Sequence, residues 1–137
     1  MEYNKVQDSG QRQEFSTGSK RDSNKGKGRF DLIPPYALKR LAQHYENGAN
    51  KYGDRNWEKG QPIARYLDSA IRHAYAYLNG GADEDHLAAV AWNALAAIET
   101  EHRIELGILP AELDNLSEQR RLLRGEKKNE TQESDSK

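Results

Sequence analysis

The apolar segment 87–98 constrains the fold more than any other part of the chain. It reads Leu-Ala-Ala-Val-Ala-Trp-Asn-Ala-Leu-Ala-Ala-Ile, so a helix formed by it is apolar on nearly every side except at Asn93. A helix that is apolar all round is normally buried, and a segment this short cannot span a bilayer. We therefore expect 87–98 to be the central helix of a helical core, in which the Asn93 side chain needs a polar partner.

Three carboxylates and an imidazole, at Asp83, Glu84, Asp85 and His86, directly precede this segment. Acidic residues are favourable at the positive end of a helix dipole, and Asp83 is a suitable N-cap. The same groups at the mouth of a buried helix are also suited to a metal or phosphate site. Capping and ligand binding therefore both remain open.

The composition narrows the class of protein. The chain has 137 residues, which predicts one domain, and a net charge of −1, which argues against a nucleic-acid interface. It contains no cysteine, which excludes disulfides and thiolate metal sites. With neither a signal peptide nor a membrane segment in the sequence, we expect a cytoplasmic protein with no membrane partner.

Both ends of the chain are poor in large apolar residues. We expect a flexible basic and polar arm at 1–28, a helical domain at 29–124 and a disordered tail at 125–137. A helical domain this small buries little surface by itself. We therefore expect a homo-oligomer, either a dimer or a tetramer.

Helical periodicity predicts an all-α fold, a small bundle of about four helices with disordered tails, and no strand. The first helix should end at Gly48, the second should span 62–78, the third should span 84–105, and the fourth should begin at Pro110. The second and third should form a tight antiparallel pair. Their predicted apolar stripes comprise Ile63, Leu67, Ala70, Ala74 and Leu78 on the second helix, and Leu87, Ala94 and Ile98 on the third.

The same pairing predicts a group of polar side chains beside the core. His86 and Asn93 are seven residues apart and share one flank of the third helix, and pairing can bring His73 next to them. Asp68 and Arg72 lie further round the second helix, where an ordinary surface ion pair is the plain interpretation. A structural histidine at 73 and a bundle-specifying asparagine at 93 are the plain alternatives to a functional site.

The polar segment 47–61, predicted to be a loop, carries cations beside aromatic side chains. Lys51, Arg55 and Lys59 surround Tyr52 and Trp57, with Asn56 between them. Cations suit phosphate and aromatic faces suit a base, which together favour a nucleotide ligand. The alternative is that the aromatic residues pin the loop to the core. The sequence has no Walker-type phosphate loop and no nucleophile signature.

Four blocks occur in a fixed order, Arg-Phe-Asp-Leu-Ile-Pro-Pro at 29–35, Lys-Tyr-Gly-Asp-Arg-Asn-Trp at 51–57, Asp-Ser-Ala-Ile-Arg-His at 68–73 and Glu-Asp-His-Leu-Ala-Ala-Val-Ala-Trp-Asn at 84–93. Together they resemble the phage-associated dATP/dGTP diphosphohydrolase domain family, over about residues 25 to 100. The resemblance implies hydrolysis of a purine deoxynucleoside triphosphate to the monophosphate and pyrophosphate, with Mg²⁺.

That family is similar to the MazG-like all-α pyrophosphohydrolases, which carry paired acids one helical turn apart on two adjacent helices. Here Arg72 stands one turn after Asp68, and the histidines could instead suit Mn²⁺ or another transition-metal ion.

Under this hypothesis the residues divide into three groups. Asp68, Glu84 and Asp85 hold Mg²⁺ (or Mn²⁺), and His73, His86 and Asp85 are catalytic, with an imidazole as general base or orienting the water. The purine nucleotide is bound by Lys51, Tyr52, Arg55, Asn56, Trp57, Arg72, Trp92 and Asn93. Two rival hypotheses are a non-catalytic phage protein that sequesters a nucleotide signal, and a helical scaffold whose arms bind a partner protein.

Overall fold

The computed structural model describes residues 3–127, and its contacts divide the chain into two compact units, 1–34 and 35–137. The first unit contains strands β1 (Arg12–Glu14) and β2 (Lys20–Asp22), which pair antiparallel with Gln13 opposite Arg21. A short 3-10 turn, η1 (Phe30–Leu32), follows. The expectation of no strand is therefore wrong. The hairpin gave no alternating apolar signal because its strands are polar and largely exposed; Gly18, with a positive φ of 85°, lies in its turn.

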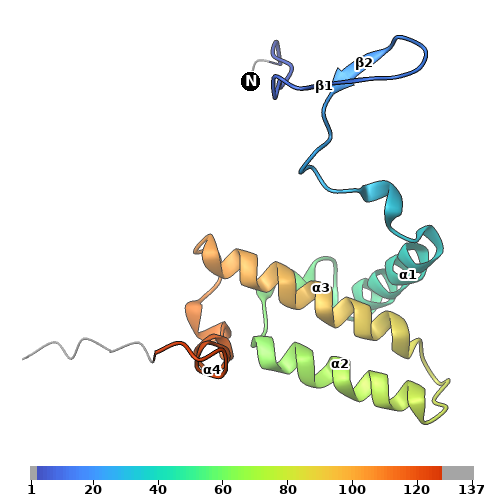
Figure 1. The fold of residues 1–137 in the computed structure, drawn as a ribbon. Coiled ribbons are helices and arrows are strands. Elements are labelled where there is room, and N and C mark those ends of the chain that lie inside the picture. The colour runs from blue at the N-terminus through green and yellow to red at the C-terminus, as the bar shows by residue number, and fades with distance from the viewer. Residues whose placement is uncertain (1–2, 128–137) are drawn as a thin grey trace, which may run out of the picture. The chain divides into compact units, whose positions relative to one another are not determined.

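The second unit is a small helical bundle, as predicted (Figure 1). It consists of α1 (Pro35–Tyr52), η2 (Asn56–Lys59), α2 (Ile63–Leu78), α3 (His86–Glu105), η3 (Ala111–Leu113) and α4 (Ser117–Leu123). The short loop between α2 and α3 returns the chain on itself, so that the two helices pack side by side, and α1 packs against α3. The predicted antiparallel pair is confirmed.

Three predicted helix boundaries are wrong. The first helix continues through Gly48 to Tyr52 and ends at Gly53, which has a positive φ of 90° and donates its N–H to the Ala49 carbonyl at 2.8 Å. Pro110 opens only the single turn η3, and α4 begins at Ser117. The N-cap of α3 is Asp85, whose carboxylate accepts the Ala88 N–H, and not Asp83.

The buried face of α3 is the face lined by small residues, not the predicted stripe. Its buried apolar positions are Ala88, Ala89, Ala96 and Ala97, and Tyr66 of α2 packs against the last two. Leu87 and Ile98 are 43% and 66% exposed, so the expectation of a helix buried all round is also wrong. Small side chains let neighbouring helices approach closely, which explains why the alanine face of α3, and not the leucine face, is the buried one. On α2 the predicted stripe is only partly right, because Ile63 is buried while Leu67 and Leu78 are exposed.

Two further expectations concern the ends and the membrane. Of the predicted disordered tail at 125–137, only 125–127 fall within the described residues, and the rest lies outside them. Within residues 3–127, no helix combines the length and the apolar character needed to cross a membrane.

Candidate functional site

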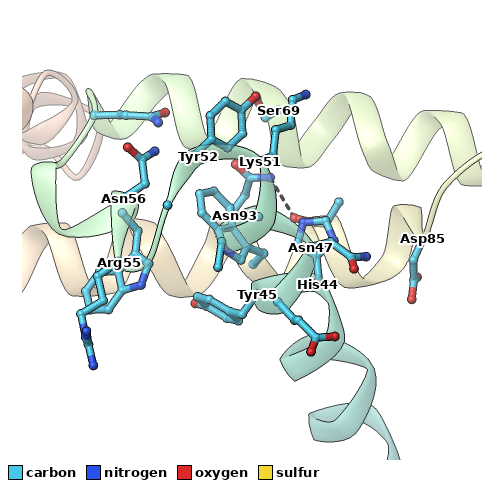
Figure 2. A pocket seen from close by; sticks show the side chains of 18 of the residues that line it. His44, Tyr45, Asn47, Lys51, Tyr52, Arg55, Asn56, Ser69, Asp85 and Asn93 are labelled. Carbon is cyan, nitrogen blue, oxygen red and sulfur yellow. Dashed lines mark hydrogen bonds between the residues drawn. The ribbon is translucent and has the colours of Figure 1, made fainter.

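An open groove of about 1500 Å³ runs along the second unit, between α1 and η2 on one side and the α2–α3 pair on the other. In Figure 2, Asp85 and Arg55 lie at opposite ends of the groove, with Asn93 between them. We call the end lined by His73, Asp83, Glu84 and Asp85 the acid–imidazole end, and the end lined by Arg55, Trp57 and Arg103 the basic–aromatic end. The groove therefore joins the two kinds of chemistry that the sequence suggested separately.

At the acid–imidazole end, two histidines and a glutamate converge. The Nδ1 atoms of His73 and His86 are 3.0 Å apart, and Glu84 Oε1 lies 3.1 Å from the first and 3.6 Å from the second. These three side chains are the group, within the described residues, whose ligand atoms lie close enough together to hold a metal ion. The predicted approach of His73 to His86 is thus confirmed.

The position of His86 follows from the turn before α3. His86 is the first residue of α3 and is buried, and its Nε2 lies 2.8 Å from Asp83 Oδ1. This hydrogen bond is the main reason that the pKa of Asp83 lies below its usual value. Gly81 leaves the room for the ring, because a Cβ at that position would lie 3.0 Å from His86 Nε2 and 2.8 Å from the Ala76 carbonyl oxygen.

Asp85 faces the groove but already has two partners. Besides the Ala88 N–H, its carboxylate accepts hydrogen bonds from Arg40 of α1, including one of 2.9 Å from Nε. The Arg40 guanidinium, followed by the backbone N–H, lowers the pKa of Asp85 to about 2. Asp85 therefore ties α1 to the start of α3.

Helix α1 lines the groove with a face that the sequence analysis missed. Its lining residues include His44, Asn47, Gly48 and Lys51, which stand at positions i, i+3, i+4 and i+7 as on one side of a helix, together with neighbours such as Tyr45. The spacing was a usable signal, but ending the helix at Gly48 hid it. Burial lowers the pKa of His44, which favours the neutral imidazole at pH 7.

Two of the predicted nucleotide-binding side chains, Lys51 and Tyr52, lie in the last turn of α1 and not in a loop. The Lys51 ammonium lies 5.0 Å from the centre of the Tyr52 ring. Arg55 adopts a left-handed conformation with φ 57° directly before η2. The interpretation that the aromatic residues pin this segment also holds in part, because Trp57 stacks under Arg103 of α3 at 5.2 Å.

Trp92 and Asn93 of α3 form the floor between the two ends. The Trp92 ring lies 6.1 Å from both Tyr45 and Tyr66, and 6.3 Å from His44. Asn93 is buried and donates its Nδ2–H to the Ala89 carbonyl at 2.8 Å. Within the described part of the chain, the Asn93 Oδ1 atom accepts no hydrogen bond. This oxygen is therefore available to accept a hydrogen bond from a ligand.

The structure does not bring Asp68 and Arg72 to the groove. Both are exposed on α2, where Asp68 Oδ2 lies 3.3 Å from Arg65 Nη1 and from Arg72 Nε. Asp68 and Arg72 therefore form the surface ion pair that was the plain interpretation of their spacing. Arg65 and Ser69 of α2 line the groove in their place.

The comparison with protein families matches residues 17–107 to the family described as dATP/dGTP diphosphohydrolase, N-terminal. The chain belongs to this family. The match covers α1, α2, α3 and the whole groove, and the family's name indicates hydrolysis of dATP or dGTP. No curated protein matches the chain, and no solved structure does.

Proposed function

We propose that the chain is a metal-dependent pyrophosphohydrolase that converts a purine deoxynucleoside triphosphate, dGTP or dATP, to the monophosphate and pyrophosphate. The observation that carries the proposal is the groove, whose acid–imidazole end and basic–aromatic end are joined by a floor of Trp92 and Asn93. In the reaction one water is consumed and the bond between the α- and β-phosphates breaks. The nucleotide leaves as the monophosphate and the other two phosphates leave as pyrophosphate.

The acid–imidazole end fits a divalent ion and the phosphates. Glu84 is the half-exposed carboxylate there, with His73 and His86 beside it, and these groups would hold Mg²⁺ or Mn²⁺. When bound, such an ion neutralises phosphate charge and makes a water more acidic. Asp68 lies outside the groove and Asp85 is held by Arg40, so neither is a ligand in this proposal.

The remaining lining residues would orient the nucleotide. Lys51 lies near the middle of the groove in Figure 2 and binds phosphate oxygens. The base lies toward Arg55 at the far end, and the neighbouring Trp57, which also lines the groove, supplies an aromatic face for it. Asn93 Oδ1 accepts a hydrogen bond from the base or sugar. Burial lowers the pKa of His44 and so favours its neutral imidazole, which can accept a proton from water.

Product analysis tests the proposal. The full chain is incubated with each of the common deoxy- and ribonucleoside triphosphates in Mg²⁺ or Mn²⁺, and the products are separated by ion-exchange chromatography. We expect dGMP or dAMP together with pyrophosphate, and loss of turnover in Glu84→Gln but not in Glu101→Gln, an exposed glutamate of α3. Release of intact nucleotide from a tight complex would instead favour the sequestering protein, and absence of any binding would favour the scaffold.

We also propose that the protein is a homo-oligomer, a dimer or a tetramer. On α2, Ile71 and Tyr75 are 56% and 64% exposed, and on α3 Ile98 is 66% exposed. A second copy of the same chain, with the same exposed apolar residues, is the occupant that would bury them. Light scattering coupled to size-exclusion chromatography should give a mass of at least two chains, and a monomer at micromolar concentration would contradict this.

A further inference from the structure

We propose that His73, Glu84 and His86 form a preformed site for one first-row transition-metal ion, such as Mn²⁺, and that the site binds this ion in preference to Mg²⁺. This inference deepens the proposed function. Only the role of the ion in hydrolysis rests on that function, and the binding of the ion does not. The ligands come from two places in the fold: His73 from α2, and Glu84 and His86 from the start of α3.

The three ligand atoms lie at separations that suit a bound cation. Their separations are 3.0 Å, 3.1 Å and 3.6 Å, and the same Glu84 oxygen serves both histidines. The circle through three points at these separations has a radius of about 1.9 Å, so a cation slightly out of their plane lies at about 2.0–2.2 Å from each, the range of metal–imidazole and metal–carboxylate bonds. The three atoms therefore already surround a point of the right size for an ion.

A hydrogen bond to Asp83 fixes the tautomer of His86. A carboxylate only accepts hydrogen bonds, so the contact to Asp83 places the ring proton of His86 on Nε2. Nδ1 then carries a lone pair directed away from Asp83, at 3.0 Å from Nδ1 of His73. A carboxylate that fixes the tautomer of a ligating histidine is the usual second partner in metal sites.

The donor atoms of the three side chains also determine which ion they prefer. Mg²⁺ prefers oxygen ligands and keeps several waters, whereas imidazole nitrogen suits transition metals. Two nitrogens and one oxygen in a group that is partly closed by the buried His86 ring therefore favour a first-row transition-metal ion over Mg²⁺. Mn²⁺ serves as the spectroscopic probe for such an ion. With three positions supplied by the protein, coordination positions remain for phosphate oxygens or water.

Metal binding without nucleotide tests the inference. The full chain is freed of metal by chelation and titrated with Mn²⁺, while free Mn²⁺ is followed by electron paramagnetic resonance. We expect one ion per chain, at least tenfold weaker binding in Glu84→Gln and in His73→Gln, and no displacement by an equal concentration of Mg²⁺. Glu84 and His73 both have exposed surface, and circular dichroism of each variant checks that the helices remain.

The matched control is His102→Gln, which removes the histidine of an exposed His102–Glu105 pair on α3, with 4.0 Å between Nδ1 and Oε2. It should bind Mn²⁺ as the unaltered chain does. Absence of Mn²⁺ binding, equal binding in the site variants, or ready displacement by Mg²⁺ would each overturn the site. Mn²⁺ binding without turnover would uphold the site and reject the proposed function, and turnover with Mg²⁺ but no Mn²⁺ binding would do the reverse.

Discussion

Asp85 shows how one side chain at this groove combines a structural and an electrostatic role. It caps α3 and pairs with Arg40 of α1, and this pairing keeps its pKa near 2, below the ordinary value of 3.8. A lowered pKa means that the charged form stabilises the folded state. That stabilisation is fully present above about pH 4 and is lost as the pH falls through the folded value toward 2.

Replacing Asp85 with asparagine should remove this acid dependence. Asparagine is also a good N-cap, so Asp85→Asn removes the charge while keeping the cap. We expect the free energy of unfolding, measured by urea denaturation from pH 5 to pH 2, to fall less steeply in Asp85→Asn than in the unaltered chain. Asp68→Asn, on the exposed face of α2, is the control; equal slopes in Asp85→Asn and the unaltered chain would contradict the role of the Arg40 pair.

Gly81 is the residue whose smallness the acid–imidazole end requires. A methyl group there would meet a backbone oxygen at 2.8 Å and the His86 ring at 3.0 Å. We expect Gly81→Ala to lower the free energy of unfolding by about 1–3 kcal/mol, as overpacking does, and to move the imidazole signals of His86 in an NMR spectrum. Unchanged stability together with unchanged signals would show that the turn adapts without moving His86.

At the scale of the elements, α1 carries the clearest difference between expectation and structure. One glycine costs a helix roughly 1 kcal/mol, which packing against α3 offsets, so Gly48 does not end α1. Gly53 does end it, because its positive φ closes the last turn. Sequence spacing alone cannot distinguish these two glycines, since the difference depends on tertiary contacts.

Gly48→Ala should therefore stabilise the protein. The position is helical and a Cβ there meets nothing within 4 Å. We expect the free energy of unfolding to rise by about 0.5–1 kcal/mol, opposite in sign to Gly81→Ala and measured in the same urea titrations. A loss of stability would mean that residue 48 is not within a continuous helix.

The pairing of α2 with α3 shows what could be predicted from the sequence. Spacing placed His86 on a flank where a neighbouring helix would bring His73, and the structure confirms it. The buried face of α3 could not be predicted in this way, because apolar residues occupy both sides of 87–98 and the packing of the neighbouring helices selects the alanines. The contribution of α1 to the groove was not predicted, because the sequence analysis ended this helix at Gly48 and not at Tyr52.

At the scale of the whole molecule, the two units differ in what they bury. The described buried residues all belong to α2 and α3, and the hairpin unit contributes none of them. A chain of residues 35–137 should therefore keep its helical circular dichroism and melt within about 3 °C of the full chain, a shift that corresponds to less than about 1 kcal/mol. Loss of cooperative melting would show that the first unit is needed for the fold.

The central claim is that the groove binds a nucleotide with its phosphates at the acid–imidazole end. A crystal structure of the full chain with Mn²⁺ and a dGTP analogue that cannot be cleaved between the α- and β-phosphates tests it most directly. We predict the ion bound by His73, Glu84 and His86, the phosphates beside it, and the base toward Trp57. Electron density for the nucleotide outside the groove, or for its phosphates at the Trp57 end, would contradict the account.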